Sequence, residues 1–239
     1  MTHFGNRLDR LLIFDGDDTL WDTQALYNDA KRRFFQYLEQ FECDPRSVAE
    51  YFEAEDLANV ASLGFTLRRF EYSIRNTAEA FCPVGSKDRD RLEKLIRSIL
   101  ASIENGATPL INGAKRLLTD LAPHYHVTLM TKGDQVLQEH RISSSGLRRS
   151  FERVYIVAEK SPDCFQRILR ETHVDARNAW SIGNSLRSYI QPALTVGMNA
   201  IWIKRTTWAW EDVIDHVDQS VSTVPVLEDI RSILIPTQG

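Results

Sequence analysis

The chain of 239 residues lacks the features that mark several specialised protein classes. Its three cysteines are far apart and fit neither a zinc-binding spacing nor a disulfide framework, which favours a reducing environment. No apolar run approaches the length of about 18 residues that a membrane span needs, and the N-terminus has no secretory signal pattern. We therefore expect a cytoplasmic protein without a membrane partner.

Clustered basic residues are also missing. The formal net charge is −4, and Lys and Arg form no long run. Because binding to a nucleic-acid backbone needs grouped positive charges, the sequence argues against nucleic acid as the main partner. Hydrophobic residues make up 43% of the chain and charged residues 26%, so we expect a folded globular protein rather than a disordered one.

What the sequence does contain is an acidic pair directly after a short apolar segment. Residues 11–14 are typical of a buried parallel strand, and Asp15 and Asp17 follow them with Gly16 between. Open α/β sheets bind ligands at the carboxyl ends of their strands. Two carboxylates at that edge indicate a functional site, although taken alone they could form a capped turn before a helix.

The rest of the chain divides into a helical block and an alternating part. Helical periodicity dominates residues 22–108, whereas expected strands and helices alternate over residues 109–239. Such alternation predicts a parallel sheet with right-handed crossovers. The sequence thus predicts an α/β, Rossmann-like core domain made of residues 1–21 and 109–239, with residues 22–108 inserted as a helical cap domain. Since the insertion follows the aspartates directly, we expect it to act as a lid.

Polar side chains also follow the later expected strands of the core: Thr131, Lys132, Lys160, Asn184 and Ser185. A carboxylate can attack phosphorus and form an aspartyl-phosphate, while hydroxyl and ammonium groups bind the phosphoryl oxygens. A second carboxylate can protonate the leaving oxygen and then activate water. The residues at this edge of the sheet therefore indicate phosphoryl transfer.

Four segments resemble the motifs of the haloacid dehalogenase-like (HAD) superfamily of hydrolases, in the family's order and spacing. The first is Asp-Gly-Asp-Asp-Thr at residues 15–19, which matches the Asp-x-Asp-x-Thr motif. The second is Thr131 after a core strand, the third is Lys160 before a helix, and the fourth is Gly-Asn-Ser at residues 183–185. The resemblance covers nearly the whole chain, and the helical block resembles the cap inserted after the first motif in many members.

The resemblance implies a phosphatase that acts on a small phosphorylated metabolite. Asp15 would be the nucleophile and Asp17 the general acid and base, while Thr131 and Lys160 would hold the phosphoryl oxygens. The substrate site would include four further residues: Gly16, Lys132, Asn184 and Ser185. A magnesium ion would be held by Asp15, Asp17 and Asn184.

The fourth motif departs from the family pattern, because Asn184 and Tyr189 stand where family phosphatases usually supply acids. Magnesium prefers hard oxygen ligands that include carboxylates, so we expect weak metal binding and slow or absent turnover. Tyr189 could pack in the core or could plug the metal position. Asn184 and Ser185 could line the site, cap the following helix, or do both.

Other functions stay open beside the phosphatase. The chain could be a HAD-fold binding or scaffold protein that has lost hydrolysis, a metal-independent 2-haloacid dehalogenase, or a phosphomutase. Asp17 fits a phosphatase better than a dehalogenase, because it would assist an oxygen leaving group. In the helical block Arg68 and Arg69 could contact a substrate, but a solvated helix face is the favoured interpretation. The sequence specifies neither the substrate nor the oligomeric state.

Overall fold

The computed structural model describes residues 9–82, 86–205, 208 and 221–235. The chain divides into two compact units. The first comprises Met1–Asp22, Thr108–Lys132 and Arg141–Gly239, and the second comprises Thr23–Ala107 and Gly133–His140. The short segment 133–140 thus groups with the helical unit, although the sequence placed it in the α/β core.

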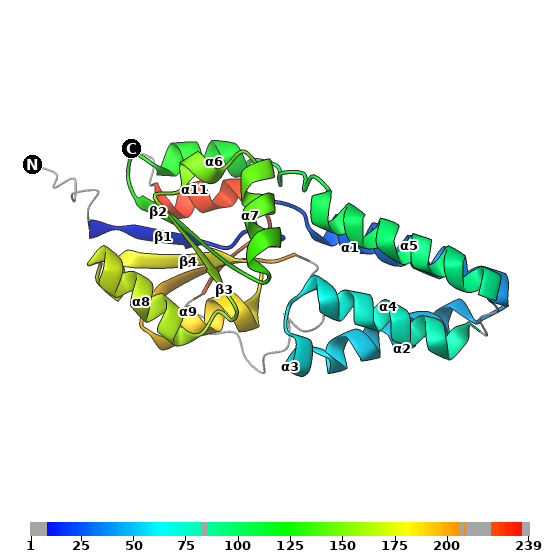
Figure 1. The fold of residues 1–239 in the computed structure, drawn as a ribbon. Helices are drawn as coiled ribbons and strands as arrows, with labels where there is room; N and C mark the ends of the chain where they lie inside the picture. The colour runs from blue at the N-terminus through cyan, green and yellow to red at the C-terminus, as the bar shows by residue number, and fades with distance from the viewer. Residues whose placement is uncertain (1–8, 83–85, 206–207, 209–220, 236–239) are drawn as a thin grey trace, which may run out of the picture. The chain divides into compact units, whose positions relative to one another are not determined.

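A parallel β-sheet organises the first unit (Figure 1). Its described strands are β1 (Leu11–Phe14), β2 (His126–Lys132), β3 (Arg153–Val157), β4 (Ala179–Gly183), β5 (Asn199–Ile203) and β6 (Ser222–Val224). They lie in the order β3-β2-β1-β4-β5-β6, and every pairing between them is parallel. The predicted α/β, Rossmann-like fold is confirmed.

Helices cover both faces of this sheet (Figure 1). On one face lie α6 (Ala114–Leu121) and α11 (Glu228–Leu234), and on the other lie α8 (Pro162–Thr172) and α9 (Gln191–Thr195). Helix α7 (Gln135–Ser144) connects β2 to β3. Alternate side chains of β1 enter the two cores, with Leu12 and Phe14 in one and Leu11 and Ile13 in the other. Burial on both faces explains why β1 is apolar throughout.

The strand order places the ends of β1, β2 and β4 side by side. Phe14, the last residue of β1, is level with Leu129 of β2 and with Ile182 of β4. Residues that follow these three positions therefore meet at one edge of the sheet.

The second unit is helical. It contains α1 (Gln24–Leu38), α2 (Pro45–Ala58), α3 (Val60–Leu63), α4 (Leu67–Phe81) and α5 (Ser86–Asn105). Helices α2 and α4 begin at side-chain caps, since Asp44 accepts from the Ser47 N–H and Thr66 accepts from the Arg69 N–H. Within the described part of the chain, none of the helices combines the length and hydrophobicity that a membrane crossing requires.

The segment after β4 differs from the single helix that its sequence predicts over residues 186–194. It forms a π-helical turn, η5 (Leu186–Ile190), followed by α9. Pro192 near the start of α9 has no N–H to donate to the carbonyl four residues earlier, which disfavours a continuous α-helix. The wider turn places Tyr189 in the core, and π-helical turns are frequent at functional sites.

Candidate active site

Asp15 lies at the end of β1 with its carboxylate buried. Its backbone N–H donates to the carbonyl of Ile182 at 2.9 Å, which extends the pairing of β1 with β4 by one residue. Its Oδ1 accepts hydrogen bonds from the Gly16 N–H at 2.7 Å and from Nζ of Lys160 at 2.5 Å. The two side chains of the Asp15–Lys160 pair are only 5% and 3% exposed. The structure thus joins two sequence-predicted site residues into a buried ion pair.

The pKa of Asp15 reflects opposing influences. Burial raises the pKa of its carboxyl above the usual value, Lys160 opposes that rise by charge and by hydrogen bonding, and the negative charge of Asp17 adds to it. The ammonium of Lys160 is therefore what makes an ionised carboxylate tolerable at this buried position. Loss of the Lys160 charge would favour the neutral, non-nucleophilic form of Asp15.

Trp21 and Arg141 both donate hydrogen bonds to Asp17, and the sequence did not single out either as a partner. Oδ1 of Asp17 accepts from Nε1 of Trp21 at 2.7 Å, and its Oδ2 accepts from Nη1 of Arg141 at 2.9 Å. The Arg141 side chain is buried near the C-terminal end of α7, whereas the Asp17 side chain keeps 26% of its surface exposed. No spacing or motif in the sequence relates Arg141 to the first strand, so sequence reasoning missed it.

Gly16 has a steric reason to be glycine. A Cβ atom at this position would lie 2.4 Å from the ring of Trp21. The absence of a side chain therefore lets the indole pack against the turn and reach Asp17. The predicted role of Gly16 in substrate binding stays a prediction.

Asn184 is fixed by the threonine of the first motif. The Thr19 hydroxyl donates to Oδ1 of Asn184 and accepts from the Asn184 N–H, both at 3.1 Å, and both residues are buried. Ser185 caps the following turn, because its Oγ accepts from the Ser188 N–H at 2.8 Å. Among the described residues, Ser185 makes the predicted capping bond and Asn184 does not.

Thr131 and Lys132 belong to β2 itself rather than to the loop after it. Thr131 is buried, and the ammonium of Lys132 donates to Oγ of Ser188 in η5 at 2.7 Å. Because β2 is adjacent to β1, both residues lie along the edge where β1 ends. Their roles toward a substrate stay predictions.

Comparison with known proteins decides the family. The sequence model of the haloacid dehalogenase-like hydrolases matches residues 12–203, which is most of the chain. The chain belongs to the haloacid dehalogenase-like hydrolases. It is thus an enzyme of the hydrolase class, as the sequence motifs predicted.

Individual relatives of this HAD hydrolase are distant. Glyceraldehyde 3-phosphate phosphatase of Pyrococcus abyssi is 26% identical over 204 residues, which cover 82% of this chain and 81% of the relative. The Pyrococcus furiosus protein of the same name is 24% identical over 231 residues, covering 92% of each chain.

Solved structures share the fold. A haloacid dehalogenase-like hydrolase from Xanthomonas campestris is 28% identical with a TM-score of 0.76, covering 95% of this chain and 92% of that one. A HAD hydrolase from Bacillus subtilis, bound to magnesium, is 21% identical with a TM-score of 0.68, covering 95% and 99%. At this lower identity the Bacillus structure supports the fold alone.

Tyr189 is fully buried beside Lys160. Its ring packs edge-on against Phe165 in the core, and Nζ of Lys160 lies 4.5 Å from the ring centroid. A Cβ atom on Gly183 would come within 2.9 Å of the same ring. Burial, with a smaller contribution from the charge on Asp15, raises the pKa of Tyr189 well above its usual value. The phenol is therefore neutral, and the Tyr189 ring both packs in the core and contacts Lys160.

The residues present at the fourth motif limit how well this edge of the sheet could bind magnesium. Oxygen atoms suited to this hard cation are present on Asp15, Asp17 and Asn184. In the described part of the chain no group of three or more His, Cys, Asp or Glu side chains is placed to hold a metal. The donor set fits magnesium chemically but offers fewer charged oxygens than a site with an acid in place of Asn184 or Tyr189.

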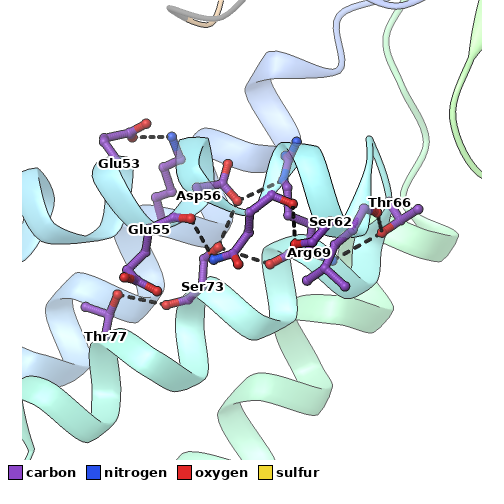
Figure 2. A network of polar contacts seen from close by, with 11 residues as sticks. Glu53, Glu55, Asp56, Ser62, Thr66, Arg69, Ser73 and Thr77 are labelled. Atoms are coloured by element: carbon purple, nitrogen blue, oxygen red, sulfur yellow. Dashed lines mark hydrogen bonds and ion pairs between the residues drawn. The ribbon is translucent and has the colours of Figure 1, made fainter. Parts of the chain in front are cut away.

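In the helical unit the environment of Arg69 differs from the prediction. Arg69 does not lie on a solvated helix face, because its side chain is 9% exposed and its Nε donates to Oδ1 of Asp56 at 3.0 Å. The Ser73 hydroxyl also donates to Oδ1 of Asp56 at 3.0 Å (Figure 2). This network joins α2 to α4 inside the unit, whereas Arg68 is exposed.

Proposed function

We propose that this hydrolase is a phosphomonoester phosphatase that acts on a small phosphorylated metabolite. The observation that carries the proposal is the buried Asp15–Lys160 pair at the end of β1. An ammonium beside a carboxylate can bind the oxygens of an anionic substrate while the carboxylate attacks it. The names of the two Pyrococcus relatives support a phosphate ester and make glyceraldehyde 3-phosphate the first substrate to test.

The reaction would proceed in two steps with Asp15 as the nucleophile. Because Gly16 and Lys160 donate to Oδ1, we assign the attack on phosphorus to Oδ2. The bond from phosphorus to the leaving oxygen breaks, and that oxygen takes a proton from Asp17. Asp17 then accepts a proton from a water molecule, which attacks the aspartyl-phosphate, releases inorganic phosphate and restores the Asp15 carboxylate.

Thr131 and Lys160 would hold the phosphoryl oxygens during both steps. Gly16, Lys132, Asn184 and Ser185 would line the substrate site. The helical unit would serve as the cap that sets substrate specificity.

Magnesium would be held weakly by Asp15, Asp17 and Asn184. When bound, the ion supplies positive charge that offsets repulsion between the nucleophilic carboxylate and the anionic substrate. Calorimetric titration should show weak binding, and a micromolar dissociation constant would contradict this expectation. Tyr189→Asp, which adds a carboxylate, should tighten the binding of magnesium in the same titration.

Asp15→Asn tests the proposed function. The amide cannot form the aspartyl-phosphate, so turnover across a panel of phosphorylated metabolites should fall by roughly 10³-fold or more. Asp18→Asn is the matched control, because Asp18 has a left-handed φ of 57° that Asn tolerates. Full activity in Asp15→Asn would show that the nucleophile is wrongly assigned.

A second candidate function is a binding protein that has lost hydrolysis, and it is favoured by the neutral residues Asn184 and Tyr189. Tyr189→Asp discriminates between the two. A large gain in magnesium-dependent turnover indicates an impaired phosphatase, whereas no change on any substrate favours the binding protein. Release of chloride from 2-haloacids would instead identify a dehalogenase.

A further inference from the structure

Both carboxylate oxygens of Asp17 are engaged by groups that can only donate hydrogen bonds. The indole Nε1–H of Trp21 donates to Oδ1, and the Arg141 guanidinium donates to Oδ2. Two donors on opposite oxygens fix both the position and the plane of a carboxylate. The direction of the remaining lone pairs of Asp17 is therefore set by Trp21 and Arg141 together.

Each donor is itself held in place. Trp21 is fully buried, and its ring packs where Gly16 leaves room for it. The side chain of Arg141 is 4% exposed, although arginine usually reaches water with its charged end. Burying a guanidinium is costly unless a carboxylate and further hydrogen bonds compensate it. The structure thus places a buried arginine in an ion pair with Asp17.

We propose that Arg141 is a positioning residue, which with Trp21 aims Asp17 at the leaving-group oxygen. A general acid must lie within about 2.6–3.2 Å of the oxygen that it protonates, so a rotated Asp17 loses its function even when it is present. The catalytic consequence rests on the proposed phosphatase activity, whereas the orientation of Asp17 does not. Lysine would supply a point charge without the planar fork of arginine and would restore the arrangement only in part.

The first experiment measures the orientation without any substrate. The NMR signal of the Trp21 indole Nε1–H, assigned by its absence in Trp21→Phe, reports the bond to Asp17. In Arg141→Met this signal should shift and should exchange faster with solvent, and Arg141→Lys should give an intermediate result. An indole signal identical to that of the wild type would overturn the proposal.

The second experiment compares leaving groups through kcat/KM. p-Nitrophenyl phosphate needs little help from a proton donor, whereas a simple alkyl monophosphate needs an acid. Arg141→Met should lower kcat/KM about 10²-fold on the alkyl ester and much less on the aryl ester. The same bias is expected in Asp17→Asn, and the double variant should lose no more than Asp17→Asn alone. Equal losses on both esters, or additive losses in the double variant, would contradict a positioning role.

Arg69→Met is the matched control, because it also breaks a buried Arg–Asp pair but does so inside the helical unit. It should keep the wild-type ratio of alkyl to aryl turnover and the wild-type Trp21 signal. If Arg141→Met does not fold, Arg141→Lys supplies the same two readouts with smaller changes. If the wild type hydrolyses neither ester but the indole responds as expected, the phosphatase assignment fails and the positioning of Asp17 by Arg141 holds.

Discussion

The two units of this hydrolase each bury an arginine against an aspartate, and the surroundings of the two pairs differ. In the helical unit Asp56 is 4% exposed, and Arg69 and Ser73 both donate to its Oδ1 (Figure 2). In the α/β unit Trp21 donates to Oδ1 of Asp17 and Arg141 donates to Oδ2, and the Asp17 side chain still keeps 26% of its surface exposed. The enclosed Asp56 carboxylate thus joins two helices, whereas the oriented and partly exposed Asp17 carboxylate is also open to contact with a substrate.

The largest difference between the two pairs is expected when the carboxylates of Asp17 and Asp56 are each replaced by an amide. Asp17→Asn should lower kcat/KM on alkyl phosphates by about 10²–10⁴-fold, the usual contribution of a general acid. Asp56→Asn should leave the rate per folded molecule unchanged and destabilise the helical unit, because Arg69 loses its charged partner. Activity assays and urea unfolding of both variants measure the contrast. Similar losses of activity in the two variants would contradict the assignment of a catalytic role to Asp17 and a structural role to Asp56.

The second-largest effect is expected when the arginine of the Arg69–Asp56 pair is replaced, and it should appear as a loss of stability. Arg69→Met leaves the Asp56 charge buried and should cost about 3–5 kcal/mol of unfolding free energy. Replacing both partners by apolar residues, in Arg69→Met with Asp56→Leu, should recover most of that loss. Hydrogen exchange followed by mass spectrometry would locate the weakened segments in α2 and α4. If the double variant were as unstable as Arg69→Met alone, the loss of stability would not come from the unpaired charge of Asp56.

The hydroxyl groups of the buried residues Tyr189 and Tyr125 differ in their hydrogen bonding. The Tyr189 hydroxyl has no hydrogen-bond partner among the described residues, whereas the Tyr125 hydroxyl donates to the carbonyl of Leu234 at 2.8 Å. Tyr189→Phe should therefore raise the unfolding free energy by about 1 kcal/mol, and Tyr125→Phe should lower it by about as much. Thermal and urea unfolding measure both changes. Destabilisation by Tyr189→Phe would indicate that its hydroxyl has a partner in solution.

The smallest effects are expected at two helix caps, one in each unit. Ser185 accepts from the Ser188 N–H, and Thr66 accepts from the Arg69 N–H. Replacing either by alanine should cost about 1 kcal/mol of unfolding free energy. Only Ser185→Ala should also raise KM, because only Ser185 is proposed to line the substrate site. An equal change of KM in Thr66→Ala would place that cap near the substrate as well.

Local pattern was enough to predict much of the fold and part of the site. The apolar run of β1 predicted a strand buried on both faces, and the alternation after residue 108 predicted the parallel sheet. Because parallel strands end at one edge, the same reasoning predicted that Asp15 and Lys160 would lie together. Pro192 in the sequence already disfavours one continuous helix over residues 186–194, but the π-helical form of η5 also depends on how Tyr189 packs, which no local pattern records.

The sequence by itself thus determined the sheet, the family and the acidic pair, since these depend on periodicity and short motifs. Only the tertiary structure decided which side chains hold Asp17 and where Tyr189 lies. Arg141 reaches Asp17 from a helix far along the chain, and Tyr189 lies against Lys160 because a π-helical turn directs it inward. The burial of a charge and the partner that compensates it are properties of the packed molecule, so no local pattern in the sequence records them.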